Sequence, residues 1–552
     1  MKPGRWLFVS AVIAAGGLAA CGGDSDSPAP APAPVPAPPP PPPAVLPPLV
    51  TDVPMLISGP SPYTVDCTGV PGAGTPYTNA EVEPYVAVNP RDPGNIVAVW
   101  QQDRWANGSA NGLMTATTTN GGTNWTLVSV PFSRCAGGTV ANGGDYERAT
   151  DPWVTISPDG IGFQMALSTV GASFTGGSAN AMLVSRSTDG GRTWSNPATL
   201  IRDGATHFND KNTITADPTD ARYVYAVWDR LVATGGGPST FARTTDGGLT
   251  WEGARSIYDP GTQSQTIGNV IAVLPNGTLV NLFAQLDTVG GTTVASLRAV
   301  RSFDKGATWG GAIRIADLLS IGARDPDVGT PIRDSALIPQ IAVAPNGDLW
   351  VVWQDARFSG GLRDGVALSR STDGGATWSP PVQINSAPNV QAFMPSIHVR
   401  ADATIGISYY DLRSNTTDPA TLPTELIFAR SANGTTWQEN RISQTFDLAI
   451  APNARGLFLG DYQGLASANN VFVPVYVRTS AGDLTNRTDV YALLAGSLLS
   501  ATASDLARAH RAIPVLTAEP DAQFRQRVHE NIVRSMNRRI TGWSERYLPA
   551  PR

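Results

Sequence analysis

A short motif that recurs six times constrains the fold of this chain more than any other feature. The complete copies are STDGGRTW at 187–194, TTDGGLTW at 244–251, SFDKGATW at 302–309 and STDGGATW at 371–378. The degenerate copies are TTNGGTNW at 118–125 and SANGTTW at 431–437. Their closing tryptophans follow one another at intervals of about 60 residues, the length of a four-stranded propeller blade with its loops. The repeat therefore predicts an all-β fold, a β-propeller.

Each residue of the motif has a structural role in a tight turn. The Ser or Thr and the Asp can bond the turn backbone, Gly supplies a positive φ, and Trp packs between sheets. Calcium binding is the alternative, but each copy has one reliable carboxylate, and a hard cation takes several oxygens. We therefore expect no metal, and we interpret the motif as part of the scaffold.

One repeat predicts four strands, at 338–345 (the inner strand), 349–357, 365–371 and 381–385. The motif then lies in the turn between the third and fourth strands, and the same order fits six times between Pro84 and Gln444. Beyond the sixth repeat, three strand-like runs lie within 458–496. The segment VPMLISG at 53–59 can supply their fourth strand and close the ring, which removes exposed sheet edges. This favours seven blades; six blades with added strands are the alternative.

The repeated strings match the Asp-box, or bacterial neuraminidase repeat, S/T-x-D-x-G-x-T-W, over nearly all of residues 84–445. On these residues the chain resembles the sialidase superfamily. In sialidases three arginines bind the carboxylate of sialic acid, a Tyr with a Glu forms the nucleophile, and an Asp is the acid/base. The Phe/Tyr-Arg-Ile-Pro motif that usually supplies the first arginine does not precede the first box, where the chain reads VEPYVAVNPRDPGN.

Charged residues gather in the loops of the face opposite the Asp-boxes. The second strand of a blade ends on that face, and here it ends repeatedly in an Asp and an Arg. These pairs are Asp103 and Arg104, Asp229 and Arg230, Asp355 and Arg357, and Asp411 and Arg413. Further carboxylates are predicted at the mouths of the inner strands, namely Glu83, Asp151, Asp210, Asp334 and Asp461, with Lys211 and Tyr462 beside them.

Two interpretations of these residues remain open. The pairs are either salt bridges between neighbouring blades or parts of a site that clamps a sugar carboxylate. For the second, loop position gives Arg230, Arg357 and Arg413 as the clamp, and Arg104 and Asp461 as further substrate contacts. The resemblance to sialidases implies Tyr410 or Tyr462 with Glu83 as the nucleophile and Asp151 as the acid.

Residues 1–20 have the features of an export signal. Lys2 and Arg5 precede the apolar run 6–15, which is too short to cross a bilayer. The LAAC at 18–21 resembles the lipobox of bacterial lipoproteins, which implies cleavage before Cys21 and lipidation of its thiol. A plain secretory signal is the alternative. Gly22 after the cysteine implies that the lipoprotein is located in the outer membrane.

Residues 21–52 follow as a linker rich in Pro and Ala, ahead of a propeller predicted at 53–499. Its run 28–48 favours extended polyproline geometry and would form a stalk of roughly 60 Å. The tail 500–552 is predicted to be helical, because apolar residues recur at helical spacing among arginines between 524 and 543. We expect this amphipathic helix to dock on the propeller; the alternatives are a partner protein or an anionic membrane surface.

The cysteines, the histidines and the net charge limit the kinds of site and partner that this chain is expected to have. Cys67 and Cys135 remain as a pair in an oxidising compartment, which predicts a disulfide, with two free thiols as the alternative. The four histidines have no ligand spacing, so no zinc site is expected. The net charge is -6, and loss of Lys2 and Arg5 makes the mature chain more acidic, so nucleic acid is not an expected partner.

These features favour a monomeric, lipid-anchored glycoside hydrolase of the bacterial cell envelope. The resemblance implies an exo-sialidase type of reaction on acidic glycan termini, without a cofactor. The alternative is a non-catalytic propeller that binds glycan or protein. In both cases the lipid anchor is the expected membrane contact.

Overall fold

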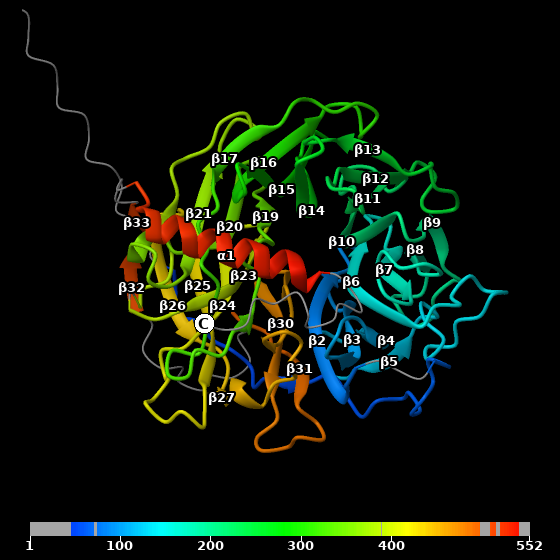
Figure 1. The fold of residues 1–552 in the computed structure, drawn as a ribbon, viewed down its shortest axis with the longest axis horizontal. Helices are drawn as coiled ribbons and strands as arrows, with labels where there is room; N and C mark the ends of the chain where they lie inside the picture. The colour runs from blue at the N-terminus through cyan, green and yellow to red at the C-terminus, as the bar shows by residue number, and fades with distance from the viewer. Residues whose placement is uncertain (1–45, 71–73, 388, 497–507, 515–518, 540–552) are drawn as a thin grey trace, which may run out of the picture. The chain divides into compact units, whose positions relative to one another are not determined.

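The structure is a computed structural model that describes residues 46–70, 74–387, 389–496, 508–514 and 519–539. The predicted signal 1–20, Cys21 and most of the Pro-rich linker lie outside these residues. The described chain is all-β apart from one α-helix and two short 3-10 turns (Figure 1). No helix in the described part is long and apolar enough to cross a membrane.

The strands pair antiparallel in groups of four, in chain order. The first group is β2 (Pro76–Val88), β3 (Ile96–Trp105), β4 (Ala110–Thr118) and β5 (Thr126–Ser129). The second is β6 (Arg148–Ile156), β7 (Gly162–Val170), β8 (Ala179–Ser187) and β9 (Ala198–Asp203). The third is β10 (His207–Ala216), β11 (Val224–Val232), β12 (Ser239–Thr244) and β13 (Arg255–Tyr258).

The next three groups follow the same order. The fourth is β14 (Ser264–Val273), β15 (Leu279–Val289), β16 (Thr292–Ser302) and β17 (Ile313–Asp317). The fifth is β19 (Gln340–Val343), β20 (Leu349–Asp355), β21 (Gly365–Ser371) and β22 (Val382–Gln383). The sixth is β23 (Ala392–Val399), β24 (Ile405–Asp411), β25 (Pro423–Ser431) and β26 (Thr436–Arg441), with β27 (Phe446–Asp447) beside β25.

The last group combines both parts of the chain. It contains β29 (Gly464–Ala468), β30 (Val471–Thr479) and β31 (Thr488–Ala492), and β1 (Met55–Leu56) pairs with β31. Met55 lies opposite Ala492, and Leu56 lies opposite Tyr491. The prediction that segment 53–59 completes the last group is therefore confirmed at these two residues.

The first strands of the groups contact one another in a closed cycle. The order of contacts is β2, β6, β10, β14, β19, β23, β29 and β2 again. The second strands are buried on both faces, because each lies inside its own group and faces the neighbouring groups. They contain Trp100, Trp228 and Trp353, which are at most 1% exposed.

The Asp-boxes form the turns between third and fourth strands, as predicted. In the box at 187–194, Ser187 Oγ donates to Asp189 Oδ1 at 2.9 Å and accepts the amide of Gly191. Thr193 Oγ1 donates to Asp189 Oδ2 at 2.6 Å, and Trp194 Nε1 donates to the carbonyl of Gly191. The motif residues thus satisfy one another within a single turn, and they form a scaffold.

The tail combines strand and helix, so the expectation of a wholly helical tail is incomplete. β32 (Arg508–Arg511) adds to β26, and β33 (Ile513–Pro514) adds to β22. The helix α1 (Ala522–Arg538) begins with Asp521, whose side chain accepts the amide of Phe524. In Figure 1, α1 crosses the ends of the central strands.

Helix α1 docks on the body through its apolar stripe, the outcome expected from its spacing. Phe524, Val528 and Ile532 are at most 5% exposed and join a core cluster with residues of β15 and β16. Two glycines of the body leave room for the helix, since a Cβ at Gly361 would meet Phe524 at 2.4 Å. At Gly322 a Cβ would meet Asn531 at 2.3 Å.

The body begins earlier than the predicted residue 53. Leu49 is 4% exposed, Thr51 pairs with Ala495, and the carbonyl of Leu46 accepts a hydrogen bond from Gln438. The predicted disulfide between Cys67 and Cys135 is confirmed, with the Cα atoms 4.8 Å apart.

Candidate functional site

Five inner strands carry a bulge at the same place, and in three of them a charged residue occupies it. The pairing register shifts between Val82 and Tyr85 in β2, and at the corresponding places in β6 and β10. The bulged residues Glu83, Asp151 and Lys211 have φ values of 55°, 54° and 50°. Residues other than glycine rarely adopt this left-handed backbone conformation. Backbone strain of this kind is concentrated at functional sites.

The bulges bring Glu83 and Asp151 to the ammonium group of Lys211, where a loop adds the carboxylate of Asp461. Lys211 Nζ lies 2.6 Å from Asp461 Oδ2, 3.3 Å from Asp151 Oδ1 and 3.8 Å from Glu83 Oε1. The amide of Lys211 also donates to Asp151 Oδ2 at 3.0 Å. All four side chains are at most 8% exposed. We call these four residues the carboxylate cluster.

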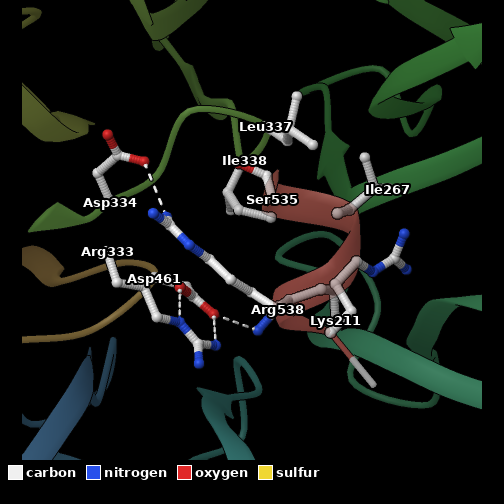
Figure 2. Close-up of a pocket in the computed structure, with 10 residues that line it drawn as sticks. Lys211, Ile267, Arg333, Asp334, Leu337, Ile338, Asp461, Ser535 and Arg538 are labelled. Carbon is white, nitrogen blue, oxygen red and sulfur yellow. Dashed lines mark hydrogen bonds and ion pairs between the residues drawn. The ribbon is translucent and has the colours of Figure 1, made fainter. Parts of the chain in front are cut away.

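Arg333 approaches the cluster from a different part of the chain. The short strands β18 (Ile332–Arg333) and β28 (Leu457–Phe458) pair in parallel, which places Arg333 beside the loop that carries Asp461. Its guanidinium binds both carboxylate oxygens of Asp461: Nε donates to Oδ1 at 2.9 Å, and Nη2 donates to Oδ2 at 2.6 Å. Figure 2 shows this fork together with Lys211 on the same carboxylate.

The three carboxyl groups differ in their pKa. Burial raises the pKa of Glu83 to about 8, although Lys211 opposes this. Burial also acts on Asp461, but Arg333 and Lys211 outweigh it and hold the pKa of that carboxyl well below its usual range. For Asp151, Lys211 likewise overcomes burial and lowers the pKa. The pKa of Glu83 is therefore shifted in the opposite direction to those of Asp151 and Asp461, so Glu83 is the carboxyl group of the cluster that holds a proton most readily.

The end of α1 closes the cluster on one side. Arg538 extends toward Asp334, with Nη1 3.8 Å from Oδ1 (Figure 2). Arg539 Nε donates to Asp210 Oδ2 at 2.6 Å, and its Nη2 pairs with Asp229. A small cavity of about 20 Å³ lies between the helix and the cluster, which is room for about one water molecule.

An aromatic layer lies beside the cluster on the inner strands. Tyr85 stacks on Trp153 at a centroid distance of 3.5 Å, and Tyr462 meets Trp153 edge-on at 5.1 Å. Tyr85 and Trp153 also line an open cavity of about 480 Å³ along the C-terminal ends of the inner strands. These ends lead into the turns on the Asp-box face.

The three arginines predicted to clamp a carboxylate do not converge. Arg230 forks onto Asp203 of the preceding group, with both contacts at 2.8 Å. Arg357 pairs with Asp355 and also donates to the carbonyl of Asp317 in β17. Arg230 thus forms a salt bridge between neighbouring groups, but with Asp203 instead of Asp229. Arg357 forms its salt bridge with Asp355 inside its own group.

Arg413 also remains outside the cluster. It binds Asp411 and Glu439 within its own group of strands. Arg104, by contrast, reaches the edge of the cluster: its Nη1 donates to Gln101 at 2.7 Å, and Gln101 donates to Glu83. Burial, with Arg333 nearby, lowers the pKa of Arg104 to about 9.

Neither predicted tyrosine is arranged as a nucleophile. The Tyr462 hydroxyl donates to the carbonyl of Pro152 at 2.9 Å, and burial raises its pKa. The Tyr410 hydroxyl lies in the core, where it donates to the carbonyl of Val477 and accepts its amide. Lys211 lowers the pKa of Asp151, the residue predicted as the acid, whereas burial raises the pKa of Glu83.

Sequence reasoning missed the roles of Arg333, Arg538 and Arg539. Nothing near Arg333 in the sequence marks it, because its partner Asp461 comes from a distant loop. A signal for the bulges does exist: Glu83, Asp151 and Met394 each precede a proline at the start of an inner strand, and all three have positive φ. In the described chain, no group of three or more His, Cys, Asp or Glu residues is arranged to hold a metal ion.

No protein-family model and no curated protein matches the chain. Among solved structures, it is similar to a protein of unknown function from Dyadobacter fermentans, with 15% identity and a TM-score of 0.42. That match covers 77% of this chain and 100% of the other.

Two glycosidases are also among the similar structures. An α-L-arabinanase from Penicillium chrysogenum, complexed with arabinobiose, has 14% identity and a TM-score of 0.43, covering 80% of this chain and 98% of its own. A Hadza microbial sialidase has 15% identity and a TM-score of 0.40, with 73% and 76% covered. Identities this low carry no residue role from one chain to another.

Proposed function

We propose that this chain is a glycoside hydrolase built on a seven-bladed propeller and acting on acidic glycans. The blade number rests on the closed cycle of inner-strand contacts and on the pairing of β1 with β31. The bacterial cell envelope as its location, with lipidated Cys21 as the anchor, follows from the LAAC sequence at 18–21. A sialidase type of reaction is the narrower form of the proposal.

One arrangement carries the catalytic proposal: Glu83, Asp151 and Asp461 share the ammonium of Lys211, and the pKa of Glu83 is raised whereas that of Asp151 is lowered. Two carboxyl groups with separated pKa values are what glycoside hydrolysis requires. Protonated Glu83 would give its proton to the leaving glycosidic oxygen. The Asp151 carboxylate would stabilise the positive charge at the sugar carbon, or take the proton of the attacking water.

Entry of a sugar would require a movement at the end of α1, since the cavity there has room for about one water molecule. Arg538 is the side chain best placed to move. Its contact with Asp334 is long, at 3.8 Å, and its Nη2 reaches the carbonyl of Ile332 at 3.4 Å. A rotation of this one side chain would join the cavity to a surface groove that Arg455 and Arg534 also line.

Product release from a panel of acidic and neutral polysaccharides by the purified mature protein tests the proposal. We expect hydrolysis of at least one acidic polysaccharide and a loss of at least 100-fold in rate on Glu83→Gln, typical of a missing general acid. Glu530→Gln, at an exposed position of α1, is the matched control and should retain the wild-type rate. A wild-type protein that releases nothing from the whole panel rules out the hydrolase.

A non-catalytic glycan-binding propeller is the second candidate. The closure of the cluster by Arg538 and Arg539 favours it, because the ion pairs neutralise the carboxylates without any ligand. In that case the protein binds acidic glycan, the glycan is recovered intact, and Glu83→Gln binds as tightly as wild type.

A further inference from the structure

We propose that a surface groove beside the last turn of α1 binds carboxylate groups of an acidic polysaccharide. The groove is about 620 Å³ and lies between α1, the start of β2 at Tyr77, and the loops that contain Asn107, Thr330 and Asn453. It deepens the proposed function, because it names the substrate class and the route by which that substrate approaches the carboxylate cluster.

The groove has an excess of positive charge. Arg455, Arg534 and Arg538 line it, and none of its described lining residues is an Asp or a Glu. Burial, together with the neighbouring Arg333 and Arg538, lowers the pKa of Arg455 to about 10. Burial also lowers the pKa of Arg538, and Arg333 and Arg534 act in the same direction, whereas Asp334 raises it. An anion placed here would relieve this repulsion.

Donor atoms in the groove wall are left without acceptors. Arg534 Nη1 and Arg538 Nε are both buried and make no hydrogen bond in the described structure. Arg538 as a whole is 7% exposed. A buried donor without a partner is unfavourable, so a side-chain movement that brings either atom to an acceptor of a bound ligand would be favoured. The planar guanidinium fork matches a carboxylate better than it matches a neutral hydroxyl.

The backbone around the groove is fixed in advance of any ligand. Arg455 has a φ of 67°, an uncommon value for an arginine, and its Nη1 donates to the carbonyls of Asn537 and Arg538. The other walls offer a half-buried tyrosine ring, at Tyr77, and the amide groups of asparagines. These are groups that contact sugar ring faces and hydroxyls.

Arg538 separates this groove from the buried cluster, because it lines both the groove and the 20 Å³ cavity. A sugar carboxylate bound in the groove would compete with Asp334 for Arg538. The side chain would then turn outward, toward the bound anion, and open the wall in front of Lys211 and Asp461. The ligand itself would thereby open the route to the cluster.

Titration calorimetry with the intact mature protein tests the groove. The probes are oligogalacturonate, its methyl ester as an uncharged ligand of the same length, and a sulfated galactan oligosaccharide. We expect oligogalacturonate to bind, the methyl ester to bind at least tenfold more weakly, and affinity to fall as salt rises. Binding of the sulfated ligand with equal strength would widen the ligand class from carboxylate to oxyanion and overturn the carboxylate preference.

Two variants of the same helix locate the binding. Arg534→Gln removes a groove arginine and should weaken oligogalacturonate binding on the order of tenfold. Arg525→Gln makes the same charge change on an exposed turn of α1, outside the groove, and should bind as wild type. Equal loss in both variants, equal binding of the methyl ester, or no binding at all overturns the inference.

Different results would reject the proposed groove and the proposed hydrolase. Tight binding that depends on Arg534, without any product, keeps the groove and rejects the hydrolase. Hydrolysis of an acidic polysaccharide that is unchanged in Arg534→Gln keeps the hydrolase and rejects the groove.

Discussion

Arg539, the residue after the last turn of α1, donates from Nε to Asp210 Oδ2 at 2.6 Å, and both side chains are at most 5% exposed. The same guanidinium pairs with Asp229 at the end of the neighbouring strand β11. One arginine thereby fixes the helix terminus to two strands of one group. Asp229 was predicted to pair with Arg230; instead Arg230 turns outward to Asp203, and the tail supplies the cation for Asp229.

Arg539→Gln should destabilise the protein by about 3–5 kcal/mol, because it leaves two buried carboxylates without their cation. The free energy of unfolding in urea measures the change. Arg525→Gln, on the exposed side of the same helix, should alter it by less than about 0.5 kcal/mol. A loss below 1 kcal/mol for Arg539→Gln would show that the helix end is not fixed by this residue.

Glu83 should make stability depend on pH in a predictable direction. Its pKa is raised from 4.5 to about 8 in the folded state, mainly by burial. The stabilising effect of the protonated group is fully present below pH 4.5 and is lost as the pH rises through about 8. Unfolding free energies between pH 5 and 9 should therefore fall more steeply for wild type than for Glu83→Gln, by up to about 1.4 kcal/mol per pH unit. Parallel curves would contradict the buried, protonated Glu83.

The second glycine of the Asp-box at 244–251 should not tolerate a side chain. At Gly248 a Cβ would meet Phe163 of the preceding group at 2.3 Å, and Phe163 is fully buried. Gly247 has a similar positive φ, but its nearest neighbour would be 3.9 Å away. Both alanine variants are strained in the backbone, so Gly248→Ala should cost a further 1–3 kcal/mol, roughly, through overlap. Equal melting temperatures for the two would show that overlap is not the cause.

The disulfide should stabilise the segment that leads into β2. It closes a loop of 68 residues between Cys67 and Cys135, for which the loss of unfolded-state entropy is about 4 kcal/mol. The double variant Cys67→Ser, Cys135→Ser should unfold at correspondingly lower denaturant. Reductant should bring wild type to the level of the variant and leave the variant unchanged; a wild type that is insensitive to reductant would count against the bond.

The scaffold was predictable from the sequence because its interactions are local. Within one box, Ser187, Asp189, Gly191 and Trp194 satisfy one another, so the residue types and their spacing already determine the turn. The same applies to the strands: those predicted at 349–357 and 365–371 correspond to β20 (Leu349–Asp355) and β21 (Gly365–Ser371).

The site was predictable only in part, because its partners come from distant segments. Sequence position placed Glu83, Asp151 and Asp461 at the mouths of inner strands, but it did not indicate which cation they share. Lys211 meets them through a bulge, and Arg333 through the parallel pairing of β18 with β28. The arginines at strand ends were visible in the sequence, yet their direction depends on carboxylates such as Asp203 in the preceding group.

The pairing of β1 with β31 also has a consequence for the time course of folding. Met55 is made early in synthesis, whereas its partner Ala492 is made near the end. The last group therefore cannot assemble until almost the whole chain is present, and until then the facing edges of the first and last groups have no partner. Contacts between such distant residues form slowly, and unpaired strand edges promote aggregation. This chain should therefore depend on chaperones mainly in the interval before its two ends meet.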